Sequence, residues 1–192
     1  MYGRGRRRPR FSLLQLDYNE SFFIDLGCIL DVEELAGQKL GLRGARRLKG
    51  RLKVGSWSLT FDPEDPETPL LRLPMREMPQ PADAWDGDPD GGEGLEVRAS
   101  LGYRRATADE PIEAVRLEEE GGGGGGCRLR FALLHTPLSL VLPLARGLHA
   151  ALQLPAAEAD ARRAELADEH CQAEEFDYAS LADPLEPLPA CT

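Results

Sequence analysis

Seven basic residues fall within fifteen positions of this sequence, residues 39–53, with no acidic residue among them. Lys49, Arg51 and Lys53 alternate, so on an extended strand their side chains point to the same side. Arginine offers paired donors and lysine a compact charge, and both suit phosphate oxygens. An anionic membrane attracts each nearby cation by about 1 kcal/mol. The candidate lipid- or anion-binding residues are Arg43, Arg46, Arg47, Lys49, Arg51 and Lys53.

A second interpretation of the same stretch is a solvated strand face whose cations pair with the acidic remainder of the chain. Residues 1–53 carry twelve Lys or Arg against six Asp or Glu, whereas residues 54–192 carry eleven against twenty-seven. A net +6 N-terminal part thus precedes a net −16 body, and the isoelectric point is near 4.9. This balance argues against nucleic acid as a partner. Both interpretations of the basic stretch stay open.

No other group of residues has the spacing of a catalytic or metal site. The histidines lack partners at metal or triad spacing, and no serine lies in a G-x-S-x-G elbow. The six-glycine run at 121–126 is followed by a strand pattern, whereas a dinucleotide-binding loop needs a helix there. We therefore predict surface histidines, no enzyme, no cofactor and no metal. The histidines are His135, His149 and His170.

The cysteines and the apolar runs indicate where the chain resides. Cys28, Cys127, Cys171 and Cys191 form neither a CxxC nor a disulfide pattern, which is typical of a reducing setting. The longest apolar run, residues 140–145, is far shorter than the roughly twenty residues of a membrane span. We expect a cytoplasmic protein for which peripheral membrane contact is possible.

The basic stretch belongs to the strongest secondary-structure signal, a β-hairpin. Leu48, Leu52 and Val54 alternate with the cations, and residues 57–61 continue a β-favouring apolar pattern. Gly55-Ser56 between them is typical of a two-residue turn. The pattern predicts strands at 48–54 and 57–61.

Further strands are expected after this hairpin. A short strand at 70–73 ends at Pro74, and the Pro-, Gly- and Asp-rich composition of residues 77–94 predicts a flexible loop. Three glutamates and six glycines predict a second flexible loop at 118–126. Weaker strands are expected at 95–101, 114–117 and 127–134.

The pattern changes to helical after the last strand. Apolar residues recur at helical spacing from Val141 to Leu152, with Pro143 tolerable in a first turn. Residues 156–173 predict a second helix with a weak apolar face. The expected organisation is a disordered basic tail at 1–10, a domain at 11–154, a helical extension at 155–178 and a disordered tail at 179–192.

This order of strands followed by a closing helix resembles a pleckstrin-homology (PH) domain, and two motifs sharpen the resemblance. Residues 10–17 (RFSLLQLD), with Phe22-Phe23 after them, are similar to the opening of FAN-type proteins of the BEACH/WD-repeat family. Residues 49–64 (KGRLKVGSWSLTFDPE) and 69–76 (PLLRLPMR) are similar to the hairpin and next strand of the same domain.

The resemblance implies a mainly β fold with C-terminal α structure. We expect a PH-like antiparallel β-barrel or sandwich, capped by one amphipathic helix and followed by a weaker second helix. Its core is expected to contain Leu52, Val54, Trp57, Leu59, Phe61, Leu71, Leu73, Leu129, Phe131, Leu144 and Leu148.

The resemblance also implies a role. Family members are signalling and membrane-traffic adaptors in which BEACH and WD-repeat domains follow this region, and no such domain follows in this sequence. We expect the chain to be a fragment or a truncated gene model. The expected function is that of a non-catalytic adaptor module in peripheral contact with phosphoinositide or in scaffold contact with its downstream domains, a signalling receptor or another adaptor. The alternative is a protein-only interaction module without lipid binding.

Overall fold

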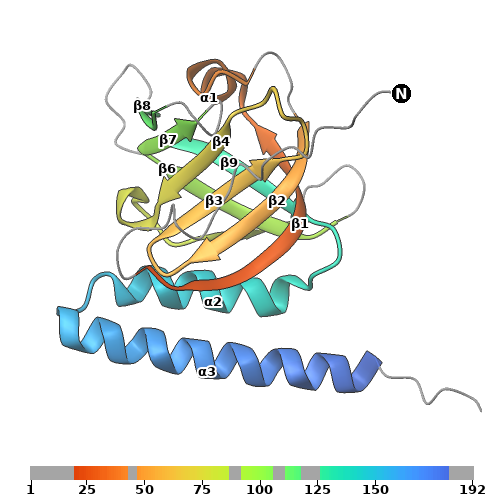
Figure 1. Ribbon diagram of the computed structural model, residues 1–192, viewed down its shortest axis with the longest axis vertical. Coiled ribbons are helices and arrows are strands. Elements are labelled where there is room, and N and C mark those ends of the chain that lie inside the picture. The colour runs from red at the N-terminus through yellow and green to blue at the C-terminus, as the bar shows by residue number, and fades with distance from the viewer. Residues whose placement is uncertain (1–19, 43–46, 87–91, 106–110, 118–125, 182–192) are drawn as a thin grey trace, which may run out of the picture.

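The computed structural model contains one nine-stranded antiparallel sheet that curls on itself, with two helices at one end (Figure 1). The structure describes residues 20–42, 47–86, 92–105, 111–117 and 126–181. The strands are β1 (Phe22–Val32), β2 (Arg47–Gly55), β3 (Ser58–Pro63), β4 (Leu70–Pro74), β5 (Asp83–Trp85), β6 (Gly94–Ala99), β7 (Leu101–Arg105), β8 (Glu113–Arg116) and β9 (Cys127–Leu133). The helices are α1 (Glu34–Lys39), the short 3-10 helix η2 (Met75–Glu77), α2 (Leu138–Ala151) and α3 (Ala156–Leu181).

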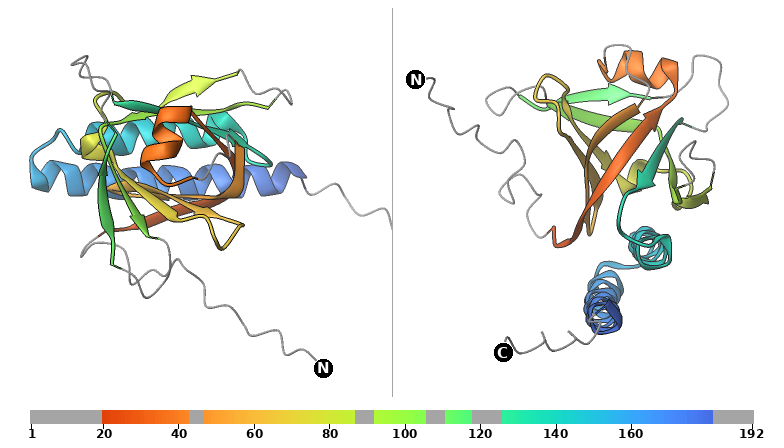
Figure 2. Two further views of the ribbon diagram at one scale, coloured as in Figure 1. Left: turned by 90° about the horizontal axis from the view of Figure 1, so that it is seen from above. Right: turned by 90° about the vertical axis from the view of Figure 1, so that its right-hand side faces the viewer.

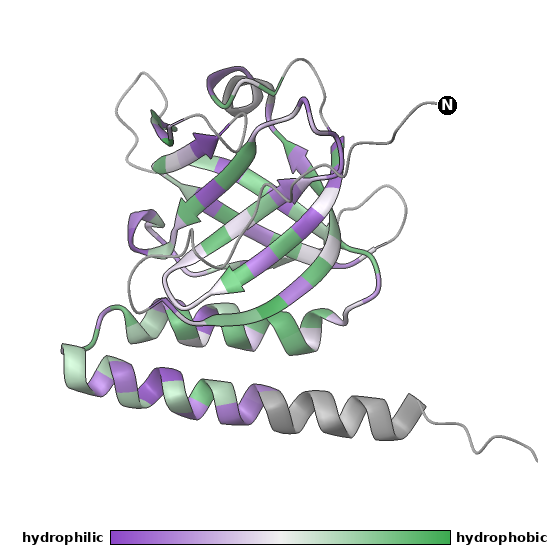
Figure 3. Cartoon of the chain, in the orientation of Figure 1, coloured by the Kyte–Doolittle hydropathy of each residue, from purple (hydrophilic) through white to green (hydrophobic). Residues whose placement is uncertain are grey.

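The strand order is β5-β6-β9-β1-β2-β3-β4-β7-β8, so β1 joins the two halves of the sheet. It pairs with β2 over most of its length and with β9 from Cys28 to Val32. Inward and outward side chains alternate along β1, because successive residues of a strand point to opposite faces. The same alternation is visible on the other strands as bands of hydrophobic and hydrophilic colour (Figure 3).

The core lies inside the curled sheet and against α2. Helix α2 crosses one open end of the sheet, and α3 lies on the far side of α2 (Figure 2). Val141, Leu144 and Leu148 of α2 are buried, as the helical spacing predicts. The mainly β fold with a closing helix and a second helix is thereby confirmed.

The predicted core is confirmed in every member except one. Trp57 is only half-buried, because it lies with Ser56 in the turn between β2 and β3 and not on a strand. Strand β2 extends through Gly55, one position beyond the predicted end of the strand at Val54. From the turn, the Trp57 ring faces Arg163 of α3, with the guanidinium carbon 5.8 Å from the ring centroid.

The prediction of a flexible loop at 77–94 is wrong for the part of this range that the structure describes. Residues 83–85 form β5, which pairs with β6, and Met78 and Ala82 are buried. Arg146 of α2 donates a hydrogen bond to the Ala82 carbonyl oxygen and another to the Asp83 carboxylate. The polar composition of residues 77–94 does not indicate these hydrogen bonds, because their donor, Arg146, is distant in the sequence.

The two C-terminal helices also differ from their predicted bounds. Helix α2 begins at Leu138, so Pro143 lies in its second turn rather than its first. Helix α3 continues to Leu181, which makes the first residues of the expected tail at 179–192 helical. The tail at 1–10 and nearly all of the loop at 118–126 lie outside the described residues.

A buried ion pair fastens the start of β1 to two later strands. The Glu20 side chain is fully buried, and its carboxylate accepts a hydrogen bond from Arg72 Nη2 at 2.6 Å and one from Ser58 Oγ at 2.6 Å. Arg72 Nε donates to Ser58 Oγ at 3.0 Å, which closes the network. A side chain at Gly55 would collide with Glu20, since a Cβ there would lie 2.6 Å from its Oε1.

We expect Glu20→Gln to destabilise the fold by about 3 kcal/mol, because loss of one partner leaves the other charge buried without compensation. Urea unfolding measures the change. The double variant Glu20→Gln/Arg72→Gln should cost clearly less than the sum of the two single changes, and exposed Glu67→Gln serves as the control. Strictly additive costs would show that the pair is not coupled.

Helix α3 packs on α2 through a glycine. A Cβ at Gly147 would lie 2.7 Å from Leu166 Cδ2, so the absence of a side chain lets the two helices approach. Leu166 and Ala159 are the buried apolar residues on the described part of α3. Most other described positions between 156 and 169 are at least partly exposed.

We expect Gly147→Leu to displace α3 while leaving the sheet intact, because the added side chain occupies the place of Leu166. Hydrogen exchange of backbone amides should show faster exchange across α3 and unchanged exchange in β1 and β9. Ala150→Leu, at an exposed position of α2, is the matched control. Unchanged protection of α3 in Gly147→Leu would contradict this packing role.

Candidate ligand-binding surface

The predicted cations of β2 lie on the outer face of the sheet, where Lys49, Arg51 and Lys53 form ion pairs with carboxylates of the same chain. Lys49 Nζ is 3.3 Å from Glu64, and Arg51 Nε is 2.7 Å from Asp25. Both basic side chains are more than half exposed. These surface pairs contribute little stability, yet they lower the positive potential that an anion would meet.

Lys53 differs from its neighbours because it is almost fully buried. Its side chain is 8% exposed, and Nζ lies 3.3 Å from Asp25 and 3.7 Å from Asp62. Two flanking carboxylates satisfy the ammonium group, as a buried charge requires. Lys53 therefore has a structural place in the sheet and is poorly exposed to an external ligand.

Of the remaining predicted cations, the structure describes Arg47. Arg47 begins β2 and is half-buried, whereas Arg43 and Arg46 lie outside the described residues. Of the six predicted residues, strand β2 thus carries Arg47, Lys49, Arg51 and Lys53.

Sequence reasoning missed the acids that partner β2. Asp25 lies on β1, which pairs with β2 in the register Asp25↔Lys53 and Gly27↔Arg51. Asp62 belongs to β3, which continues through Pro63 although residues 62–67 have the composition of a turn. The available signal was Asp25 between apolar Ile24 and Leu26, a pattern that places a carboxylate on the outer face of a strand.

The predicted surface location of the histidines is wrong for His170. His135 is exposed and His149 is half-buried, with Nε2 3.1 Å from the Met78 carbonyl oxygen. His170 is buried between α2 and α3, because the neighbouring helix covers a position that an isolated helix would expose.

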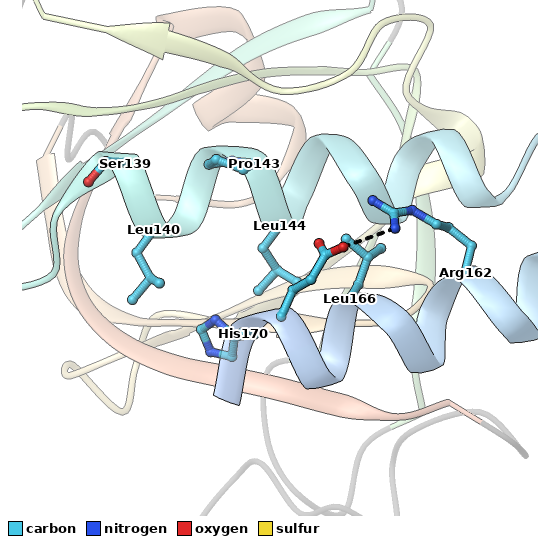
Figure 4. A pocket seen from close by; sticks show the side chains of 8 residues that line it. Ser139, Leu140, Pro143, Leu144, Arg162, Leu166 and His170 are labelled. Carbon is cyan, nitrogen blue, oxygen red and sulfur yellow. Dashed lines mark hydrogen bonds and ion pairs between the residues drawn. The ribbon is translucent and has the colours of Figure 1, made fainter. Parts of the chain in front are cut away.

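His170 lines a half-open pocket of about 200 Å³ between the two helices (Figure 4). Leu140, Leu144 and Leu166 supply apolar walls, and Arg162 bridges Glu169 at 3.2 Å on the rim. The hydrogen bonds that Arg162 donates to the carboxylates of Glu165 and Glu169 raise the pKa of Arg162 above its ordinary value. The pocket is too small for a large ligand, and its rim charges already pair with each other.

Cys28 and Cys127 are buried cysteines in the described part of the chain. Burial raises the pKa of Cys28 to about 12, outweighing the opposing effects of a backbone hydrogen bond and of nearby Lys53 and Arg51. A thiol with this pKa is almost entirely protonated at neutral pH and is therefore a poor nucleophile. Within the described residues, no three His, Cys, Asp or Glu side chains gather as a metal site would require.

Residues 1–93 match the model of a protein family described as the FAN protein N-terminal PH domain. The match spans 93 of the 192 residues. The match confirms the resemblance drawn from residues 10–17 and 49–76. It includes β1 to β5, whereas β6 to β9, α2 and α3 complete the same curled sheet and close its end.

Comparison with solved structures finds no match. Among the described residues, no helix has both the length and the apolar character needed to cross a membrane. PH domains are generally interaction modules rather than enzymes. The FAN-type PH assignment therefore directs attention to surfaces rather than to a catalytic centre.

We expect iodoacetamide at pH 8 to leave Cys28 unmodified in the folded chain and to modify it fully in urea. The reason is twofold: the side chain is inaccessible, and its raised pKa keeps the thiol protonated. Stability from this thiol is fully present below pH 9 and is lost as pH rises from about 9 towards 12, because the unfolded thiol ionises first.

Peptide mass spectrometry measures the modification at each cysteine. A fragment containing Cys171 or Cys191 provides an internal comparison within the same digest. Rapid labelling of Cys28 in the folded chain would contradict the buried, protonated thiol.

Proposed function

We propose that the chain is a non-catalytic PH-type module of a cytoplasmic BEACH-family adaptor in signalling and membrane traffic, and that its working contacts are with proteins. The observation that carries the proposal is the neutralisation of β2, where Asp25, Glu64 and Asp62 pair with the strand's cations. A phosphoinositide site at this strand would have to compete with those carboxylates.

The charge of the whole chain supports the same choice. A net charge of −10 repels an anionic membrane wherever local cations do not outweigh it. A protein partner presents both charge signs and can match a mixed surface. The partners proposed are the BEACH and WD-repeat domains of the adaptor and, beyond them, a signalling receptor or another adaptor protein.

Peripheral contact with anionic lipid is the second candidate. The observation that favours it is the acid-free stretch 39–53, in which Arg43 and Arg46 add to the cations of β2. In this case the lipid would meet the segment before β2 more than the paired residues on the strand.

Vesicle sedimentation separates the two candidates. We expect residues 1–192 to bind vesicles containing phosphatidylinositol 4,5-bisphosphate no better than neutral vesicles at about 0.15 M salt, where surface charges are screened within roughly 8 Å. Binding abolished by Arg43→Glu/Arg46→Glu, but kept in the exposed control Arg76→Glu, would instead establish the lipid role. Lys53 is left unchanged because its burial makes substitution a folding defect.

The protein contact is tested by calorimetric titration with the BEACH and WD-repeat region of a FAN-type protein supplied in trans. Saturable, salt-sensitive binding without any vesicle response supports the protein-facing role. Absence of heat with this region, together with phosphoinositide-dependent sedimentation, would overturn it.

A further inference from the structure

Two arginines lie directly opposite each other on the outer face of β6 and β9. The register pairs Arg98 with Arg128 and Glu96 with Arg130. Neighbouring Val97, Ala99 and Leu129 point inward and are buried, so the arginines occupy the outer positions. This pair lies beyond residue 93, outside the family match and apart from β2.

The nearby acids contact Arg128 and Arg130 and leave the Arg98 side chain without an ion pair in the described part of the chain. Glu96 lies 3.2 Å from Arg128 Nε and 2.9 Å from Arg130 Nε, so one carboxylate is divided between two guanidinium groups. Glu33 is more distant, at 3.9 Å from Arg128 Nε. Arg130 also lies over the Trp85 ring, at 5.6 Å from its centroid.

Arg98 and Arg128 both retain unused donors. Arg98 is half-buried, and its side chain has no hydrogen bond or ion pair with any residue in the described part of the chain. Arg128 Nε is buried and donates no hydrogen bond, although the Glu96 carboxylate is close. Each guanidinium carries five N–H groups in a fixed plane, so the pair presents many hydrogen-bond donors.

Like charges directly opposite each other on neighbouring strands are destabilising. An oxyanion between the two guanidinium groups would attract both of them and would accept hydrogen bonds from their unused N–H groups. A phosphate monoester suits the arrangement because it carries a charge of about −1.5 to −2 at pH 7 and three acceptor oxygens. Clusters of arginine are the usual means by which proteins recognise phosphorylated motifs.

The surroundings favour a single phosphate over a membrane. Glu96, Glu33 and Asp31 lie beside the arginine pair, and Asp31 is opposite Arg130 in the register of β1 and β9. A membrane would bring many anionic headgroups against these carboxylates, whereas one phosphorylated side chain needs only the two arginines.

We propose that Arg98 and Arg128 form a binding site for the phosphate group of a phosphorylated peptide. The choice of a peptide partner rests on the proposed protein-facing function, whereas the anion site rests on the geometry of β6 and β9. Its test uses a small probe and is therefore independent of the titration with the BEACH and WD-repeat region.

The test is a titration of the ¹⁵N-labelled chain with N-acetyl-phosphoserine N-methylamide, followed by the side-chain Nε–Hε signals of arginine. We expect saturable shifts confined to Arg98, Arg128 and their strand neighbours. Arg98→Gln should raise the dissociation constant at least about tenfold. Arg116→Gln, at an exposed position of β8, is the matched control and should leave binding unchanged.

Two further variants make the outcome decisive. Arg98→Lys keeps a positive charge but loses the planar pair of donors, and it should weaken binding without disturbing the amide spectrum. Glu118→Gln/Glu119→Gln/Glu120→Gln lowers the negative charge of the sequence that precedes β9. Absence of saturable binding in both the natural chain and this triple variant would overturn the proposal.

Two other results would also overturn it. Equal shifts at Arg76, Arg98 and Arg116 would indicate general ionic association rather than a site. Binding to phosphatidylinositol 4,5-bisphosphate vesicles that is lost in Arg98→Gln, without any response to the phosphoserine probe, would assign the arginines to a lipid headgroup instead.

Discussion

The fold depends on β1 pairing with β2 on one side and with β9 on the other. The β1–β2 pairing is made between neighbours in sequence, whereas the β1–β9 pairing joins segments about a hundred residues apart. Such a long-range contact must overcome loop-closure entropy before it yields stability. Since β9 lies beyond residue 93, the family-matched segment by itself lacks a strand that the centre of the sheet requires.

The same pairing decides the electrostatics of the candidate surface. Because β1 runs beside β2, Asp25 is placed against Arg51 and Lys53, and β3 adds Asp62 from the other side. A strand that reads as cationic in the sequence therefore belongs to a mixed-charge face. On β6 and β9, Arg98 and Arg128 lie opposite each other, and the nearby acids contact Arg128 and leave the Arg98 side chain without an ion pair in the described part of the chain.

The two helices are held by different amounts of apolar contact. Helix α2 buries a full apolar stripe against the open end of the sheet. Helix α3 rests on α2 through Leu166 and on the β2–β3 turn through Arg163 and Trp57. The attachment of this second helix thus depends on a few side chains, and most of residues 156–170 are at least partly exposed.

The sequence by itself determined the β2–β3 hairpin, most of the core and helix α2, because apolar spacing of two or of 3.6 residues reports local structure directly. Its two motifs also led to the FAN-type PH family. Only the tertiary structure decided that Lys53 is buried, that Trp57 lies in a turn and that residues 83–85 form a strand. These outcomes depend on Asp25, Arg163 and Arg146, which are distant in sequence, and a local pattern carries no information on which distant residue will lie beside it.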